Sequence, residues 1–201
     1  MVDPTFGLYF SVIQTLERLD APYVIIGAFA GMSYGVTRLT ADVDIVVDLA
    51  GGHLQALAAA YPPPRYYADL YQMQDSMQRG MMFNIIDSSE GRKVDLIPVT
   101  MPPGYGFALK NRIRRTVLHR AEPLAAWLAR PEDVIVGKLM AWKEGHSFKH
   151  AQDIRDILVA VRLNEEPEWT AHFDFDYVTR WAIQLGEQVT QFWKQVRAAA
   201  Q

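Results

Sequence analysis

The stretch YVIIGAFAGMSYGVTRLTADVDIVVD, residues Tyr23 to Asp48, decides how this chain of 201 residues is interpreted, because it combines an apolar run, a small-residue turn and paired carboxylates. Tyr23 to Ile26 is rich in β-branched side chains, which predicts a buried strand. Gly27-Ala28 ends this strand. Phe29 to Tyr34 has helical composition, and Gly35 stands where a C-terminal cap is expected. We therefore expect a strand, a turn and a short helix before the carboxylates.

A second strand is predicted where acidic and β-branched residues alternate, from Asp42 to Asp48. A period of two puts Asp42 and Asp44 side by side on one face and leaves the other face apolar. Carboxylates this close raise each other's pKa and destabilise the fold unless a cation lies between them. Oxygen ligands suit Mg²⁺ or Mn²⁺, so the pattern indicates a metal site. The alternative is an edge strand whose acidic face is solvated.

A third carboxylate, Asp95, stands between apolar residues in a segment with strand character. Met82 to Asp87 and Lys93 to Val99 flank Ser88-Ser89-Glu90-Gly91, which is typical of a hairpin. This hairpin is expected to carry Asp95 back toward the first acidic pair. Three aspartates would then converge from neighbouring strands.

This order of motifs resembles the nucleotidyltransferase superfamily of the DNA polymerase beta type. The signature of that superfamily is Gly-Gly or Gly-Ser, a helix and loop, an Asp-x-Asp pair among hydrophobic residues, and a third Asp on a neighbouring strand. Gly27-Ala28, Asp42-Val43-Asp44 and Val94-Asp95-Leu96 match it here. Ala28 departs from the pattern, since the superfamily usually has Gly or Ser there. A hydroxyl contact to a triphosphate is therefore missing, although a backbone N–H at the helix start can still serve.

The resemblance implies an α+β fold, with a nucleotidyltransferase-type mixed β-sheet flanked by helices and followed by a C-terminal helical region. We expect a catalytic domain over residues 1–122 and a helical C-terminal domain packed against it over residues 123–201. The helices expected from hydrophobic spacing and caps cover residues 6–19, 53–61, 132–144, 150–163 and 177–197, the last broken near Gly186, while residues 123–128 are expected to be extended.

Composition limits the class of protein. Half of the chain is hydrophobic and 21% is charged, which is typical of a soluble globular protein. The net charge of −3 argues against nucleic-acid binding by bulk electrostatics. The absence of cysteine excludes disulfides, thiol catalysis and Cys-based zinc sites. The first residues contain no basic segment followed by an apolar one, so we expect no signal peptide, no membrane partner and a cytoplasmic location.

The second half of the chain narrows the resemblance. Pro131 to Leu139 and Gln152 to Leu158 are similar to the C-terminal region of AbiEii-type nucleotidyltransferases, which include toxins of toxin–antitoxin systems. In that family a lysine on the first helix and an aspartate on the next complete the active site, which matches Lys138 and either Asp153 or Asp156. The residues alone also allow Lys138 to lie on the surface, Asp153 to cap a helix and Asp156 to pair with a neighbouring arginine.

Three aspartates converging from adjacent strands meet the requirement of two-metal phosphoryl transfer. Asp42 and Asp44 would bind Mg²⁺ or Mn²⁺, and Asp95 would bridge the ions or act as a base near an acceptor hydroxyl. The resemblance implies an NTP as co-substrate, whose triphosphate Lys138 would contact. The further candidate nucleotide-binding residues are Gly27, Ala28, Thr37, Arg38, Thr40, Asp153 and Asp156. Loop capping is the alternative for the threonines and Arg38.

Two more patterns bear on partners. Lys110 to Arg120, KNRIRRTVLHR, interleaves basic and apolar residues, and it is either a strand that offers cations to phosphates or a solvated amphipathic face. His146 and His150 have the i, i+4 spacing of a zinc pair, but the residues between them predict a loop rather than a helix, which argues against a metal role.

The resulting hypothesis is a metal-dependent enzyme that transfers NMP from an NTP to RNA, a protein or a small molecule, as the toxin of a toxin–antitoxin system with an antitoxin partner would. The alternative is a catalytically silent nucleotide-binding or antitoxin-like partner module. Ala28 favours the silent module, whereas the intact set of Asp42, Asp44 and Asp95 argues against it.

Overall fold

The computed structural model describes residues 7–38, 40, 42–118 and 123–200. Its contacts divide the chain into two compact units. Unit 1 comprises Met1–Ile26 and Thr40–Leu128, and unit 2 comprises Gly27–Leu39 and Ala129–Gln201. None of the helices found in the described ranges is both long enough and apolar enough to span a membrane.

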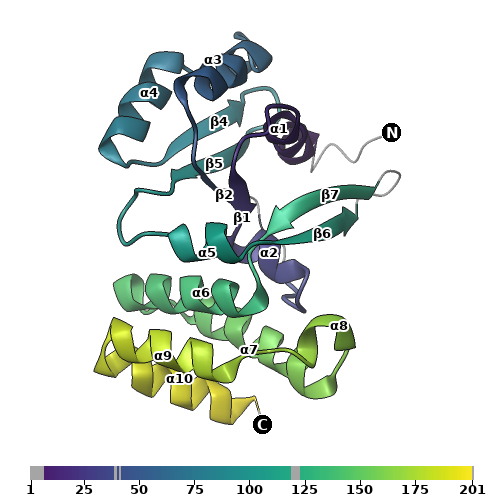
Figure 1. Cartoon of the computed structure of the whole chain (residues 1–201), viewed down its shortest axis with the longest axis vertical. Coiled ribbons are helices and arrows are strands. Elements are labelled where there is room, and N and C mark those ends of the chain that lie inside the picture. Colours follow the sequence, from purple (N-terminus) through teal and green to yellow (C-terminus); the bar gives the residue numbers. More distant parts are fainter. Residues whose placement is uncertain (1–6, 39, 41, 119–122, 201) are drawn as a thin grey trace. The chain divides into compact units, whose positions relative to one another are not determined.

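Unit 1 is built on a mixed sheet, which has seven strands in the described residues in the order β3-β4-β5-β2-β1-β7-β6 (Figure 1). The central strand β2 pairs in parallel with β5 and antiparallel with β1, and β1 also pairs in parallel with β7. The strands are β1 (Tyr23–Ile25), β2 (Asp42–Val47), β3 (Tyr66–Tyr67), β4 (Phe83–Asp87), β5 (Arg92–Pro98), β6 (Ile113–Leu118) and β7 (Pro123–Leu128).

The helices of unit 1 cover the apolar side chains of this sheet. On β2, Val43 and Ile45 alternate with the aspartates and are fully buried, as are Val94 and Leu96 on β5. Burial of each such side chain stabilises the fold by about 1.5–3 kcal/mol. Helix α1 (Gly7–Arg18) packs on β5, and α4 (Leu70–Arg79) packs on β4 and on α3 (Gly51–Ala60), while α5 (Gly106–Asn111) lies against β1. The alternation predicted for β2 is therefore confirmed.

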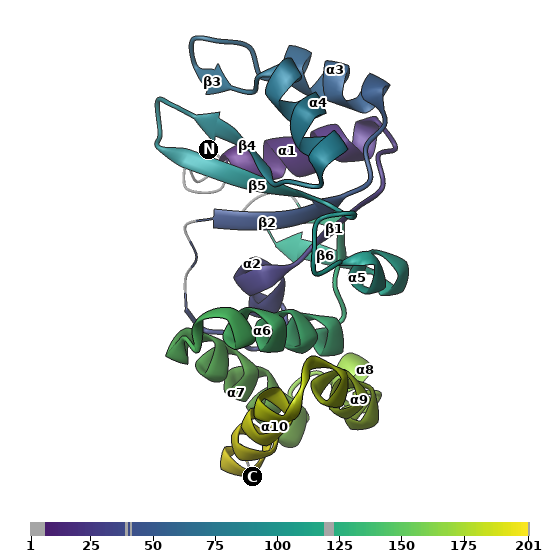
Figure 2. The same ribbon diagram turned by 90° about the vertical axis from the view of Figure 1, so that its left-hand side faces the viewer.

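Unit 2 is helical, and α6 (Pro131–Gly145) is its central element (Figure 2). Pro131 occupies the first turn of α6, where its missing N–H costs nothing, and two acids follow it at the positive end of the helix dipole. Helix α6 contacts α2 (Gly27–Met32), α7 (Phe148–Leu163), α9 (Phe175–Leu185) and α10 (Glu187–Ala199). Its Trp142 ring stacks on Phe192 of α10, with 3.8 Å between ring centroids.

The helices and strands that were predicted occur in the expected order, including the hairpin of β4 and β5 and the break at Gly186 between α9 and α10. The sequence analysis did not predict α5 or α8 (Pro167–Thr170), because helices of six and four residues are too short to show a helical period. Phe6, His119 and Arg120, which belonged to predicted segments, lie outside the described residues. The division into domains at residue 122 stays a prediction.

Gly35 follows α2 with a φ of 96°, a backbone conformation that favours glycine. A Cβ added there would lie 3.0 Å from the Cβ of Ala160. We expect Gly35→Ala to lower the free energy of unfolding by about 1–3 kcal/mol in urea denaturation, because it combines strain with overlap. The control is Gly137→Ala on α6, where a Cβ would meet nothing within 4 Å and a gain of about 0.5–1 kcal/mol is expected. Equal effects of the two substitutions would contradict this account.

Candidate functional site

The carboxylates of Asp42, Asp44 and Asp95 lie on one face of unit 1. Strands β2 and β5 run in parallel with Asp44 directly opposite Asp95, and paired residues of neighbouring strands point to the same side of a sheet. Asp42 is two residues before Asp44 and shares that side. The side chain of Asp42 is 45% exposed, whereas that of Asp95 is only 8% exposed. The face therefore presents carboxylates at different depths.

Lys93 also projects from this face, because it is two residues before Asp95 on β5 and opposite Asp42 on β2. Its Nζ donates hydrogen bonds to Oδ2 and Oδ1 of Asp95 at 2.9 and 3.2 Å, and it lies 3.8 Å from Oδ2 of Asp42. The hydrogen bond with Asp95 raises the pKa of Lys93 above its ordinary value. The sequence analysis predicted a cation beside the acidic pair, and the Lys93 ammonium provides part of that positive charge.

Asn84 of β4 completes the surroundings of Asp95. It stands opposite Asp95 in the antiparallel β4–β5 pair, and its Nδ2 donates a hydrogen bond to Oδ1 of the carboxylate. The carboxylate is therefore held from the β4 side by an amide and on its own strand by an ammonium. These contacts limit the rotation of a side chain that is almost fully buried.

The oxygen ligands on this face suit a divalent ion that also binds water and substrate phosphates better than an ion bound by protein ligands alone. Within residues 7–38, 40, 42–118 and 123–200, no three His, Asp or Glu side chains are arranged to hold a metal ion. Asp42 and Asp44 nevertheless offer carboxylate oxygens on one face. Mg²⁺ usually takes one or two carboxylates and completes its shell with water and substrate phosphates. The metal-ligand role of Asp42, Asp44 and Asp95 stays a prediction.

A second cluster of charged residues lies within unit 2. Arg38 donates two hydrogen bonds to Asp153, from Nε to Oδ1 at 2.6 Å and from Nη2 to Oδ2 at 2.8 Å. Nζ of Lys138 lies 2.6 Å from Oδ2 of the same carboxylate. Asp153 is fully buried and Lys138 is 6% exposed, so the interpretation of Lys138 as a surface residue is wrong. One buried carboxylate thus contacts two cations.

The other predicted nucleotide-binding residues either make local contacts or lie at the start of α2. The backbone N–H and the hydroxyl of Thr37 both lie 3.4 Å from Oδ2 of Asp156. The hydroxyl of Thr40 donates to the carbonyl of Asp42 at 2.8 Å, which is the local capping that the sequence left as an alternative. Gly27 begins α2 with a φ of 70°, and Ala28 follows it in a buried position.

His150 stands near the cationic cluster, and among the described residues its buried Nδ1 has no hydrogen-bond partner. Burial, together with the positive charges of Lys138 and Lys149, lowers the pKa of His150 to about 4. His150 lies in the first turn of α7, whereas His146 is the C-terminal cap of α6, so the two rings are not on the same helix. The predicted loop between the histidines is shorter than expected, because Phe148 and Lys149 already belong to α7, and the absence of a zinc role stays a prediction.

This pKa predicts a pH dependence of stability. The unfolded chain takes up the His150 proton near pH 6.5, whereas the folded protein takes it up only near pH 4. The free energy of unfolding should therefore fall between pH 6.5 and pH 4. Solvent screening at a partly buried ring limits the loss to about 1–2 kcal/mol. His150→Gln should make urea denaturation less pH-dependent in this window, and the difference between variant and wild type at pH 8 measures the packing effect alone. An unchanged slope in the variant would contradict the assignment.

Residues 113–118 of the basic segment form strand β6, and part of the charge of this segment is used inside unit 1. Arg114 makes a two-pronged ion pair with Glu17 of α1, one bond of which is 2.8 Å long. The guanidinium groups of Arg112 and Arg114 also lie 4.9 and 5.3 Å from the ring centroid of Trp127 on β7. These contacts favour a structural role for both arginines over phosphate binding.

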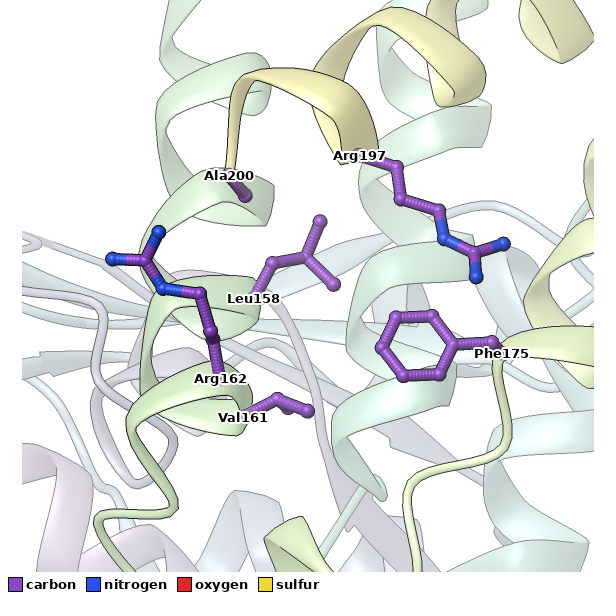
Figure 3. A pocket seen from close by; sticks show the side chains of 6 residues that line it. All are labelled: Leu158, Val161, Arg162, Phe175, Arg197 and Ala200. Carbon is purple, nitrogen blue, oxygen red and sulfur yellow. The ribbon is translucent and has the colours of Figure 1, made fainter.

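Unit 2 also contains a pocket of about 250 Å³ (Figure 3). Its surface is mainly apolar, and the guanidinium of Arg197 lies 4.6 Å from the ring centroid of Phe175 at its edge. The six residues that line it include none of the predicted site residues; they are Leu158, Val161, Arg162, Phe175, Arg197 and Ala200. The pocket has no carboxylate and no nucleophile, so it does not belong to the candidate site.

The sequence analysis missed two residues of the site, Lys93 and Asn84. Both could have been found. Lys93 shares the face of Asp95 by the period of two, and counting back from the hairpin turn, where Asp87 pairs with Arg92, places Asn84 opposite Asp95. The contact between Arg38 and Asp153 joins residues 115 positions apart and left no local pattern in the sequence.

Comparison with known proteins adds a likeness of fold. No protein-family model and no curated protein matches the chain. Among solved structures, the antibiotic-resistance factor ANT(2'')-Ia is similar, with a TM-score of 0.51 and 15% identity over 92% of this chain and 96% of that chain. An antigenic nucleotidyltransferase-like protein from Paracoccidioides brasiliensis has a TM-score of 0.47 and 19% identity over 81% of this chain and 78% of that chain. By its mixed sheet, flanking helices and C-terminal helices, the chain has the α+β fold of nucleotidyltransferases.

Proposed function

We infer that this chain is a metal-dependent nucleotidyltransferase that transfers NMP from an NTP to an acceptor. The observation that carries this function is the carboxylate face of unit 1, where Asp42, Asp44 and Asp95 project from neighbouring parallel strands. Carboxylates grouped in this way hold divalent ions against phosphates in phosphoryl-transfer enzymes. The likeness of fold to ANT(2'')-Ia is compatible with the same type of reaction.

Each aspartate has a proposed role. Asp42 and Asp44 hold Mg²⁺ or Mn²⁺, which when bound polarises the phosphate oxygens and neutralises charge that develops on them. Asp95 completes the ligand set or accepts the proton of the acceptor hydroxyl, and its contacts with Asn84 and Lys93 keep the carboxylate oriented for this task. As the acceptor oxygen bonds to the α-phosphorus, the bond from that phosphorus to the bridging oxygen breaks, and pyrophosphate leaves with the electron pair.

Arg38 and Lys138 are proposed to bind the triphosphate, with Asp153 as the residue that orients them. Both are cationic side chains held on the same buried carboxylate, and guanidinium and ammonium groups form charge-assisted hydrogen bonds with phosphate oxygens. Because the buried carboxylate already fixes both cations, little reorganisation is needed when charge develops on the leaving pyrophosphate. The side chain of Arg38 is 35% exposed, so a ligand can approach its guanidinium. In the sequence, Arg38 comes only four residues before Asp42.

Further contacts with the nucleotide are proposed for Thr37 and Thr40 and for the first residues of α2. The first backbone N–H groups of a helix have no partner within the helix, so those at Gly27 and Ala28 suit phosphate oxygens. Thr37 and Thr40 would add hydroxyl contacts once the nucleotide competes for their present partners, and Asp156 would position Thr37.

The acceptor is proposed to be RNA, a protein or a small molecule, and the toxin hypothesis belongs to the first two classes. A toxin of the AbiEii type would modify RNA or a protein, arrest growth and be relieved by an antitoxin partner. The second candidate function is a catalytically silent nucleotide-binding or antitoxin-like module, in which the ion pair of Lys93 with Asp95 only stabilises the face.

The decisive experiment incubates the full chain with each α-³²P-labelled NTP, Mg²⁺ and three separate acceptor pools: purified tRNA, protein extract and small polyols including aminoglycosides. We expect label from at least one NTP to enter one pool, with release of pyrophosphate, and Asp44→Asn to abolish it. Nucleotide binding by equilibrium dialysis without any labelled product would favour the silent module. Absence of both nucleotide binding and transfer would overturn the proposed function.

A further inference from the structure

Lys93 fills the space between two of the carboxylates that a pair of metal ions would share. Its Nζ is 2.9 Å from Oδ2 of Asp95 and 3.8 Å from Oδ2 of Asp42. A magnesium ion requires carboxylate oxygens at about 2.0–2.1 Å in nearly octahedral geometry. An ion that bridged Asp42 and Asp95 would compete directly with this ammonium for the same oxygens.

The position of Lys93 follows from the strand itself rather than from a flexible surface chain. A period of two on β5 points Lys93 and Asp95 to the same side, and the parallel register places Lys93 beside Asp42. Its side chain is 40% exposed, so the ammonium is held by carboxylates below and is accessible to a ligand from above. The ion pair therefore joins a partly exposed ammonium to a carboxylate that is only 8% exposed.

We propose that Lys93 takes the place of the second metal ion in the proposed transfer reaction, so that the site binds one divalent ion, at Asp42 and Asp44, and uses the Lys93 ammonium as its second cation. This inference rests on the proposed function. The ammonium contacts the acceptor oxygen or a non-bridging oxygen of the α-phosphate and stabilises the negative charge that develops there. Lys93 thereby becomes a catalytic residue that the sequence motif did not include.

The test measures the number of metal ions bound per chain and does not depend on the rate of turnover. The full chain is saturated with a non-hydrolysable α,β-methylene ATP analogue, and bound Mn²⁺ is measured by electron paramagnetic resonance during titration. We expect one Mn²⁺ per wild-type chain, and two in Lys93→Met, which keeps the length of the side chain but frees Asp42 and Asp95. Lys93→Arg should still bind one ion. The matched control is Lys110→Met, which removes an exposed lysine from α5 and should also bind one.

The outcomes separate this inference from the function on which it rests. Two Mn²⁺ ions per wild-type chain, or one ion in both wild type and Lys93→Met, would overturn the role of Lys93 and leave the transferase function standing. Failure of the wild type to bind the analogue with Mn²⁺ would overturn both. Where the labelled-NTP assay finds a product, Lys93→Met should lower kcat by about 10²–10³-fold, as loss of one preorganised cationic contact does, and Lys93→Arg should recover part of it. Thermal unfolding of each variant shows that the fold is retained.

Discussion

The substitution Asp153→Asn is expected to lower the free energy of unfolding by about 3–5 kcal/mol, the effect of removing one partner from a buried ion pair. Asp153 is fully buried, and its carboxylate receives hydrogen bonds from Arg38 and contacts the ammonium of Lys138. An amide removes the negative charge that both cations contact and leaves the two cations close together. The repulsion between the two cations and the cost of their desolvation then destabilise the folded state but not the unfolded state.

The measurement is urea denaturation followed by tryptophan fluorescence, with Asp156→Asn as the matched control one helical turn away on α7. Asp156 accepts hydrogen bonds from Gln152 and Thr37 in a less buried setting, so its replacement should cost less than about 1 kcal/mol. Similar losses in the two variants would mean that the cluster around Asp153 is not a buried ionic network.

Asp153 also makes a second acid-sensitive contribution, separate from that of His150. Burial alone would raise the pKa of Asp153, but hydrogen bonds from Arg38 and Lys138 outweigh burial, and the pKa is lowered. A lowered carboxyl pKa means stabilisation that is present above about pH 4 and is lost as the pH falls below it. Wild type should therefore lose stability in two steps, and Asp153→Asn should lack the step at lower pH.

The substitution Asp44→Asn is expected to reduce nucleotidyl transfer by about 10³-fold or more while the protein stays folded. Catalysis in the proposed site depends on a divalent ion held by Asp42 and Asp44, and an amide oxygen is a weaker, uncharged ligand. Asp44 is only half-buried and lies beside the carboxylates of Asp42 and Asp95, so removing its charge relieves repulsion. Thermal stability without metal should be unchanged or slightly higher.

The control is Asp48→Asn, which removes an exposed carboxylate that follows the end of the same strand. Labelled-NTP assays at saturating Mg²⁺ should find Asp48→Asn as active as wild type. If Asp44→Asn unfolds, the residue is structural. If it folds and retains full activity, the metal-binding role of this face is wrong.

Local patterns in the sequence were sufficient to predict the strands that carry the carboxylates. Acidic and β-branched residues alternate along β2 with the period of a strand, and the hairpin turn at residues 88–91 brings β5 back along the sheet. Such patterns are readable because a strand alternates its faces regardless of its neighbours. The same local argument predicted that residues 123–128 are extended, although nothing in their composition reports that β7 pairs with β1.

Only the tertiary structure decided which charges meet. Arg38, Lys138 and Asp153 come from a loop and two helices, and their mutual contact depends on the packing of α6 and α7, which leaves no trace in residue spacing. Lys93 and Asp95 share a face by sequence, yet the proximity of Lys93 to Asp42 arises from the parallel pairing of β5 with β2, which are separated by 44 residues of chain. Periodicity determines the side to which a residue points, whereas non-local hydrogen bonding and packing determine which residues it contacts on that side.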